Sequence, residues 1–126
     1  MEWELDSGRP VYLQLIERIQ AGIISGYYKP GDRLPSVREL AAEAAVNPNT
    51  MQKALADLER TGLLYTNRTS GRFITSDESM IKKLKEQSAL ELVQEFIERM
   101  QQHGFEPKET LAYVTDIVNN NKKVEN

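Results

Sequence analysis

The chain has 126 residues, 40% of them hydrophobic and 28% charged, which excludes a disordered chain and allows one ordinary domain or a small domain with an appendage. The net charge of −3 comes from residues 77–126, which hold seven basic and ten acidic side chains, whereas residues 1–76 hold nine of each and so do not exclude contact with nucleic acid. No apolar run approaches the ~20 residues of a membrane span, the N-terminus lacks a signal-peptide pattern, and the absence of cysteine excludes disulfides, so we expect a cytoplasmic protein.

The first predicted element is an amphipathic helix from Pro10 to Ser25. A proline suits the first turn of a helix, where its missing N–H is not needed. Apolar side chains then recur at steps of three and four residues, as on one face of a helix. They are Tyr12, Leu15, Ile16, Ile19 and Ile23. The stretch YYKPGDRLP, with two prolines and a glycine, ends this helix.

Two further helices are predicted on either side of the sequence VNPNT. The first begins at Ser36, an N-cap residue that forms a capping box with Glu39. The second begins at Asn47, a favoured N-cap, with Pro48 at the first helical position, and it ends before Gly62. Its inner face carries Met51, Ala54, Leu55 and Leu58. Its outer face carries Asn49, Gln52, Lys53 and Arg60.

A β-hairpin follows these helices. LLYT and RFIT are short and rich in β-forming residues, and the sequence NRTSG between them has the composition of a turn. Arg68 and Arg72 are expected at the tip of this hairpin. Helix, helix, tight turn, helix and hairpin is the order of a winged helix-turn-helix, so we predict a mainly α fold with a small β-hairpin.

Residues 77–126 have a different character from residues 1–76, which form the predicted winged domain. Two amphipathic helices are expected, one ending at His103 and Gly104 and one running from Pro107 to about residue 119, followed by a polar, frayed tail, NNNKKVEN. Two such helices cannot bury both of their apolar faces alone, so they need the first domain or a second copy of the chain. We interpret them as a dimerisation segment. Its predicted contact residues are Leu92, Phe96, Ile97, Leu111, Val114 and Ile117.

The start of the third helix is the predicted DNA-reading site. A helix-turn-helix places the first residues of its second helix against base edges in the major groove, where amides bond adenine and threonine bonds several bases. Suitable side chains at this end are Asn47, Asn49, Thr50, Gln52 and Lys53. The alternative is an ordinary solvated helix face, and for Asn47 alone capping is the favoured interpretation.

Other candidate contacts have stronger structural alternatives. Arg38 lies where a side chain can reach a phosphate, but for this residue alone the favoured interpretation is a surface arginine paired with Glu39 or Asp32. The hairpin arginines, Arg68 and Arg72, suit a wing that lies along DNA, and exposed arginines also decorate inert turns. Gly71 is either a close-approach position or a turn glycine. Lys29 and Arg33 are expected in solvent.

Catalytic and metal chemistry is not expected. His103 is the one histidine of the chain, which excludes a histidine-rich metal site or a Ser–His–Asp triad within one copy. The sequence has neither a P-loop nor a GxGxxG pattern. We therefore expect no cofactor, no metal and no enzyme activity.

The segment KPGDRLPSVRELAAEAAVNPNTMQKALADLERTGLLYTNRTSGRFIT resembles the DNA-binding domain of the GntR family of bacterial transcription regulators, from about Pro10 to Ile74. The shared motifs are GDRLPSVRELA, ALADLERTGLL and the wing glycine followed by an aromatic residue in SGRF. The short helical tail and NPNT resemble the YtrA-like branch. That resemblance implies a homodimeric repressor, often of a transporter operon.

The resemblance also implies roles for individual residues. Arg38 matches an arginine that contacts phosphate or base, and Gly71 matches the wing glycine. Asn49 and Thr50 match positions where relatives place contacting threonines. Two departures affect the DNA sequence that is read, because Pro48 and Gln52 stand where many relatives have contacting arginines. A third departure, Ala45 in place of a turn glycine, implies strain if that residue needs a positive φ.

These observations favour a homodimeric repressor that binds an inverted-repeat operator in double-stranded DNA. The alternative is a winged-helix module for protein–protein interaction that has no sequence-specific DNA binding. The sequence leaves open whether a small-molecule effector binds.

Overall fold

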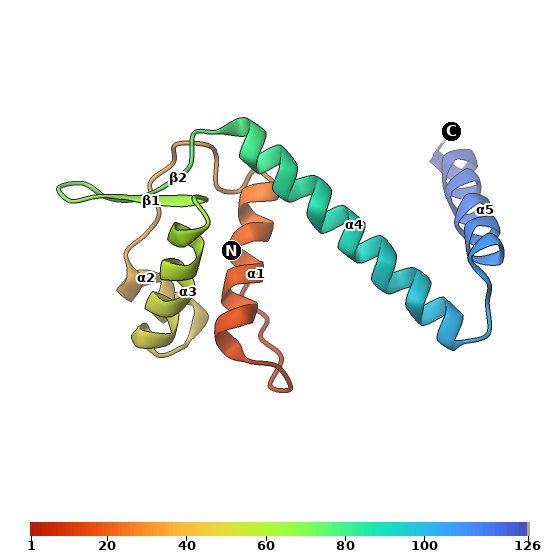
Figure 1. Ribbon diagram of the computed structural model, residues 1–126, viewed down its shortest axis with the longest axis horizontal. Coiled ribbons are helices and arrows are strands. Elements are labelled where there is room, and N and C mark those ends of the chain that lie inside the picture. The colour runs from red at the N-terminus through yellow and green to blue at the C-terminus, as the bar shows by residue number, and fades with distance from the viewer. Residues whose placement is uncertain (126) are drawn as a thin grey trace. The chain divides into compact units, whose positions relative to one another are not determined.

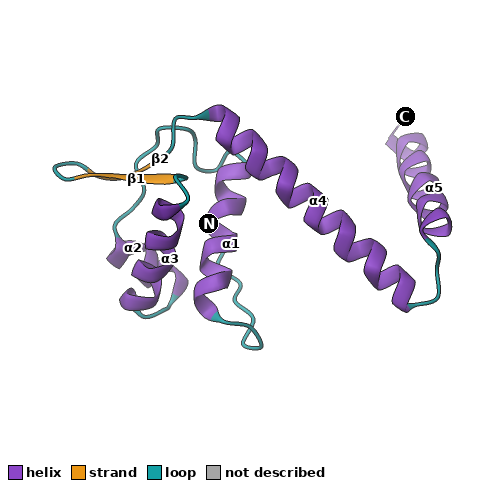
Figure 2. Cartoon of the chain, viewed as in Figure 1, coloured by secondary structure: helices purple, strands orange, loops and turns teal. Residues whose placement is uncertain are grey.

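The computed structural model describes the backbone of residues 1–125 and the side chains of residues 1–120. Its elements in chain order (Figure 1) are α1 (Val11–Ile24), α2 (Val37–Ala44), α3 (Pro48–Arg60), β1 (Leu64–Asn67), β2 (Gly71–Ile74), α4 (Glu78–Gln102) and α5 (Pro107–Glu125). This mainly helical chain with one hairpin (Figure 2) confirms the predicted fold class. α5 continues past the predicted end near residue 119, and the last residue of the predicted polar tail, Asn126, lies outside the described part.

Two compact units make up the chain, Met1–Lys85 and Glu86–Asn126. The first turns of α4 belong to the first unit, because Met80, Ile81 and Leu84 pack against its core. Contacts therefore continue beyond residue 76, where the sequence suggested a division. The assignment of one part to DNA binding and the other to dimerisation stays a prediction.

The core of the first unit lies where α3 packs on α1, on α2 and on β1. Most of the apolar residues spaced at three and four along these helices turn inward, which explains why the sequence pattern located them. The largest fully buried side chains are Leu15, Ile19, Leu40, Met51, Leu55, Leu58, Leu64 and Ile74.

Both ends of α2 have a defined local geometry. The Ser36 hydroxyl accepts from the Glu39 N–H at 3.1 Å, as predicted, but the Glu39 carboxylate accepts from that hydroxyl rather than from the Ser36 backbone N–H. Ala45 ends α2 in the left-handed region, with φ of 57° and ψ of 46°. The condition for strain at this alanine is therefore met, since a side chain in this region is unfavourable.

The hairpin pairs β1 with β2 in antiparallel register, from Leu64 opposite Ile74 to Asn67 opposite Gly71. Tyr65 and Phe73 stack on one face of it, with ring centroids 5.5 Å apart. Phe73 also forms an isolated bridge with Arg33, in the loop before α2. The wing is thus attached to the body of the first unit along β2.

The second unit buries almost none of its side chains. α4 has no buried residue, and of the side chains in residues 86–120 only Thr110 is buried. Phe105 and Tyr113 meet edge to face, with centroids 5.5 Å apart, after the turn at Gly104. Within the described residues, no helix combines the length and the apolar character that a bilayer crossing requires.

Candidate nucleic-acid interface

The first turn of α3 is capped by Asn47, the residue that the sequence predicts as its N-cap. The Asn47 side-chain oxygen accepts a hydrogen bond from the Asn49 backbone N–H at 2.8 Å, and Pro48 stands at the first helical position. Because the cap occupies the Asn47 oxygen, the capping interpretation of this residue is confirmed. The cap fixes the direction in which the next residues project.

The other predicted reading residues lie on the open face of α3. Asn49, Gln52 and Lys53 are exposed, and Thr50 is half-buried. Asn49 and Lys53 are four residues apart and therefore lie on one side of the helix. Their shared face is opposite to Met51, Leu55 and the other core residues, so this row of amide, hydroxyl and ammonium groups is free to meet a ligand.

Lys53 has an unexpected neighbour at the start of α1. Its Nζ lies 3.9 Å from the centroid of the Tyr12 ring, within the range of a cation–π interaction. The sequence pattern placed Tyr12 on the buried face of α1, but the ring is only half-buried.

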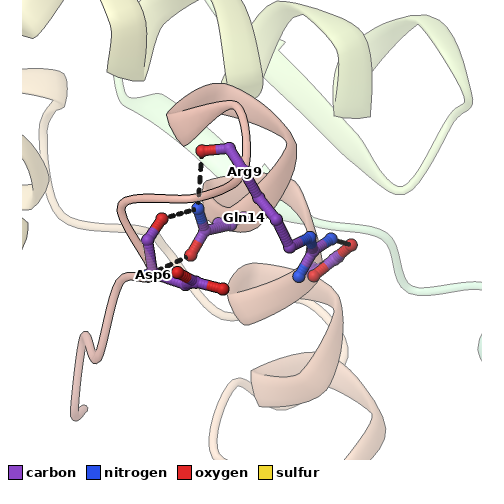
Figure 3. A network of polar contacts seen from close by, with 4 residues as sticks. Asp6, Arg9 and Gln14 are labelled. Atoms are coloured by element: carbon purple, nitrogen blue, oxygen red, sulfur yellow. Dashed lines mark hydrogen bonds and ion pairs between the residues drawn. The ribbon is translucent and has the colours of Figure 1, made fainter.

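The start of α1 is held by a buried glutamine. Gln14 is 5% exposed, and its amide accepts from the Asp6 N–H at 2.6 Å and donates to the carbonyls of Asp6 at 2.6 Å and Arg9 at 3.0 Å (Figure 3). Arg9 in turn pairs with Glu17. Sequence reasoning missed this network; its one signal was a glutamine directly before Leu15 on the apolar face.

Arg38 is exposed on α2 and forms no ion pair or hydrogen bond within the described residues. The alternative considered from the sequence, pairing with Glu39 or Asp32, is therefore not formed. Asp32 instead accepts from the Lys29 N–H at 2.8 Å. The Arg38 guanidinium is available for a phosphate.

The two hairpin arginines lie in different places. Arg68 is exposed in the turn, as predicted. The expected tip position of Arg72 is wrong: Arg72 lies in β2, and its Nε is 2.7 Å from a carboxylate oxygen of Glu59 on α3. The alternating pattern of a strand turns this side chain toward the helix. Arg72 thus fastens the wing to α3.

The Glu59 carboxylate has a second hydrogen-bond donor besides Arg72. Its carboxylate also accepts from the Thr66 hydroxyl on β1. Burial acts to raise the pKa of Glu59, but the hydrogen bonds from Thr66 and Arg72 and the charge of Arg72 outweigh it and lower the pKa below its ordinary value. The carboxylate is therefore charged at neutral pH and holds both strands of the wing.

Gly71 has both properties that were considered for it. Its φ is 109°, and a Cβ at this position would lie 3.1 Å from Nε of Arg33. The group that approaches Gly71 closely in this structure is thus an arginine of the same chain. Arg33 is exposed, as the sequence predicted, although its side chain passes close to Gly71.

No group of three or more His, Cys, Asp or Glu side chains in the described part of the chain is arranged to hold a metal ion. The exposed polar side chains of α3 itself are amides and basic groups, which are hydrogen-bonding partners of bases and phosphates.

Comparison with known proteins identifies the protein family of this chain. Residues 11–74 match the family model described as bacterial regulatory proteins, gntR family. The chain belongs to the GntR family. It is 41% identical over 87 residues to the HTH-type transcriptional repressor YtrA of Bacillus subtilis, covering 64% of this chain and 67% of YtrA.

Solved structures agree with this assignment to the GntR family. A GntR family transcriptional regulator from Listeria monocytogenes is 38% identical, with a TM-score of 0.82 over 89% of this chain and 98% of its own. The DNA-binding domain of AraR in complex with operator ORE1 is 32% identical, with a TM-score of 0.51 over 60% of this chain and 94% of its own. These findings confirm the YtrA-like resemblance and a DNA-binding transcriptional regulator rather than an enzyme.

Proposed function

We propose that this GntR-family regulator is a cytoplasmic homodimeric repressor that binds an inverted-repeat operator in double-stranded DNA. The observation that carries the proposal is the capped, exposed first turn of α3, which presents amide and hydroxyl groups beside Lys53. The AraR domain, of similar fold, is bound to an operator in its solved structure. Similarity to YtrA supports repression, and the YtrA-like resemblance suggests a transporter-type operon as the target.

In this proposal the site residues divide into two groups. Asn49, Thr50 and Gln52 read base edges, since amides and hydroxyls bond bases in the major groove. Positive charge for the phosphates comes from Lys53, Arg38 and the wing residue Arg68. The remaining predicted residues hold these contacts in place: Asn47 caps α3, Arg72 fixes the wing to α3, and Gly71 leaves room for the side chain of Arg33.

The proposal assigns dimerisation to the second unit. Its apolar side chains stay exposed within one copy: Leu92 is 64% exposed, Phe96 44%, Leu111 65%, Val114 38% and Ile117 61%, and Ile97 is half-buried. If these side chains form one patch, a surface of this kind is uncommon on soluble monomers. Leu92 and Phe96 also line a hollow of about 430 Å³ with Met100 and Phe105, and these four side chains suit apolar side chains of a second copy, while Glu95, Arg99 and His103 complete the lining.

A two-fold partner would place two copies of α3 one DNA turn apart, ~34 Å, or a multiple of that distance. The operator is then an inverted repeat, because each half-site meets the same protein surface. This geometry sets the length of DNA to be tested.

Selection from a pool of random duplexes tests the proposal directly. Duplexes retained by the full-length protein should share an inverted repeat, and Asn49→Ala should weaken binding to that repeat by ~1–3 kcal/mol while leaving random-sequence binding nearly unchanged. Gln94→Ala, an exposed amide on α4, is the matched control. Retained duplexes without a common sequence would favour the alternative of a protein–protein interaction module.

A further inference from the structure

The pairing of Tyr12 with Lys53 has no role in the function described so far. Tyr12 is the second residue of α1, and Lys53 belongs to the outer face of α3. The Lys53 Nζ lies 3.9 Å from the centroid of the Tyr12 ring. No other ion pair or hydrogen bond of Lys53 is present within the described residues, so the aromatic ring is what positions its ammonium group.

An aromatic ring positions a lysine in a way that a carboxylate does not. The π-face attracts the ammonium through its quadrupole but carries no net charge, so the lysine keeps its full positive charge. One side of the ammonium faces the ring, and its N–H groups on the other side stay available to an acceptor. A carboxylate in the same place would neutralise the charge that a phosphate needs.

The backbone that carries the Tyr12 ring is held in place by neighbouring contacts. Gln14, two residues after Tyr12, binds the backbone of Asp6 and Arg9 and so ties the segment before α1 to its first turn (Figure 3). Leu15 in the same turn is fully buried against the core. Tyr12 therefore projects from a fixed piece of backbone.

Lys53 lies one helical turn after Asn49 on the same side of α3. If Asn49 reads a base, the ammonium of Lys53 is directed along the same side, toward the DNA backbone that borders the groove. A lysine left free must give up side-chain freedom when it binds, and a lysine already held over a ring gives up less.

We propose that Tyr12 is a positioning residue, which holds Lys53 ready for a phosphate and makes the start of α1 part of the DNA-binding surface. This inference rests on the proposed function. It separates two roles that a tyrosine can have at such a place: the ring acts through Lys53, and the hydroxyl is not needed.

Four variants test the role of Tyr12. The affinity of each variant is measured for an operator duplex and for a random duplex at several defined salt concentrations. Tyr12→Leu should weaken binding to both DNAs by about two- to five-fold, the range expected from an exposed cation–π pair. Tyr12→Phe keeps the π-face and should bind like the unaltered protein. Lys53→Ala should lower the slope of log K against log[salt] by roughly one unit. In the Lys53→Ala background, Tyr12→Leu should cost nothing further.

Two results would contradict the positioning role of Tyr12, and a third would contradict the proposed function. Equal losses for Tyr12→Leu with and without Lys53, or a loss for Tyr12→Phe as large as for Tyr12→Leu, would overturn the positioning role. Unaltered protein that prefers no sequence would instead contradict the proposed function.

Nuclear magnetic resonance gives a readout that does not depend on DNA or on the folding of Tyr12→Leu. The ε-methylene protons of Lys53 should be shielded by the ring in the unaltered protein and in Tyr12→Phe. Unshifted lysine resonances in both proteins would overturn the inference.

Discussion

The two units of this protein differ in how far their apolar side chains are buried. In residues 1–85, the spaced leucines and isoleucines of α1, α2 and α3 converge on one core, and Leu15, Ile19, Leu55 and Ile74 are fully buried. In residues 86–120, side chains of the same kind stay in solvent, and Leu111 is 65% exposed. α4 and α5, and α4 above all, are less strongly amphipathic than α1, α2 and α3, so apolar side chains spaced along a helix do not by themselves produce a core.

The difference lies in how many faces converge. Three helices and a hairpin enclose a common volume in the first unit, whereas α4 and α5 offer only two apolar faces. Burial of apolar area is the main favourable term in folding. We therefore expect the first unit to fold alone and the second unit to need the partner proposed above.

Removing the second unit is the strongest way to test this comparison. A chain of residues 1–85, which keeps Met80, Ile81 and Leu84 on the core, should fold and be monomeric. Its affinity for a full operator should fall by on the order of 10²–10⁴-fold, because the second half-site contact is no longer tethered to the first. Sedimentation and an operator titration at fixed salt measure both effects.

A point substitution should imitate that truncation. Phe96→Glu places a charge in the proposed interface and should give a monomer, while Gln94→Glu adds the same charge at an exposed polar position of α4 and should stay dimeric. A full-length monomer at micromolar concentration, or undiminished operator affinity of the shorter chain, would contradict this account of the second unit.

Matched leucine deletions sharpen the comparison further. Leu55→Ala, in the core of the first unit, should lower the free energy of unfolding by ~2–5 kcal/mol. Leu111→Ala should leave the unfolding of the first unit unchanged and weaken only the dimer. Urea denaturation at several protein concentrations distinguishes them, since only the second effect depends on concentration. A large, concentration-independent loss for Leu111→Ala would show that the second unit has a core of its own.

The wing arginines test how self-contained the first unit is. Arg72→Ala removes the ion pair with Glu59 and should cost about 1 kcal/mol of stability in both the full chain and residues 1–85. Arg68→Ala should cost no stability and weaken DNA binding.

The pH dependence of stability should report on Glu59. Because the pKa of Glu59 is lowered in the fold, its contribution to stability is present above the ordinary glutamate pKa of ~4.3 and is lost as pH falls through the lower, folded value.

Stability measured between pH 7 and pH 2 checks the sign of this dependence. The gap between the unaltered protein and Arg72→Ala should be constant at neutral pH and close in acid. A gap that widens in acid would mean that the carboxylate is not the partner that matters.

The smallest expected effect comes from the turn before α3. Ala45 has a φ of 57°, and the left-handed conformation costs an alanine ~1–2 kcal/mol. Glycine removes that strain but gains freedom in the unfolded chain, so Ala45→Gly should stabilise residues 1–85 by about 0.5–1 kcal/mol. The same substitution at Ala42, within α2, should destabilise, and thermal unfolding of the two variants provides the contrast.

Local signals in the sequence predicted much of this structure. Asn47 and Pro48 mark the start of α3 because a cap needs only the residues beside it. The contacts that sequence reasoning missed join segments far apart in the chain: Arg72 with Glu59, Arg33 with Gly71, and Tyr12 with Lys53. Each depends on how α1, α3 and the hairpin pack, and a periodic pattern carries no information about which polar side chains meet across that packing.

Trp3 gives the first unit an optical signal of its own. It is the one tryptophan of the chain, and it packs against the core formed by α1, α2 and α3, with its indole N–H buried. Its emission spectrum should therefore change only when the first unit opens, whereas helical circular dichroism follows α4 and α5 as well. Heating the protein while recording both signals separates unfolding of the second unit from unfolding of the first, without any added dye.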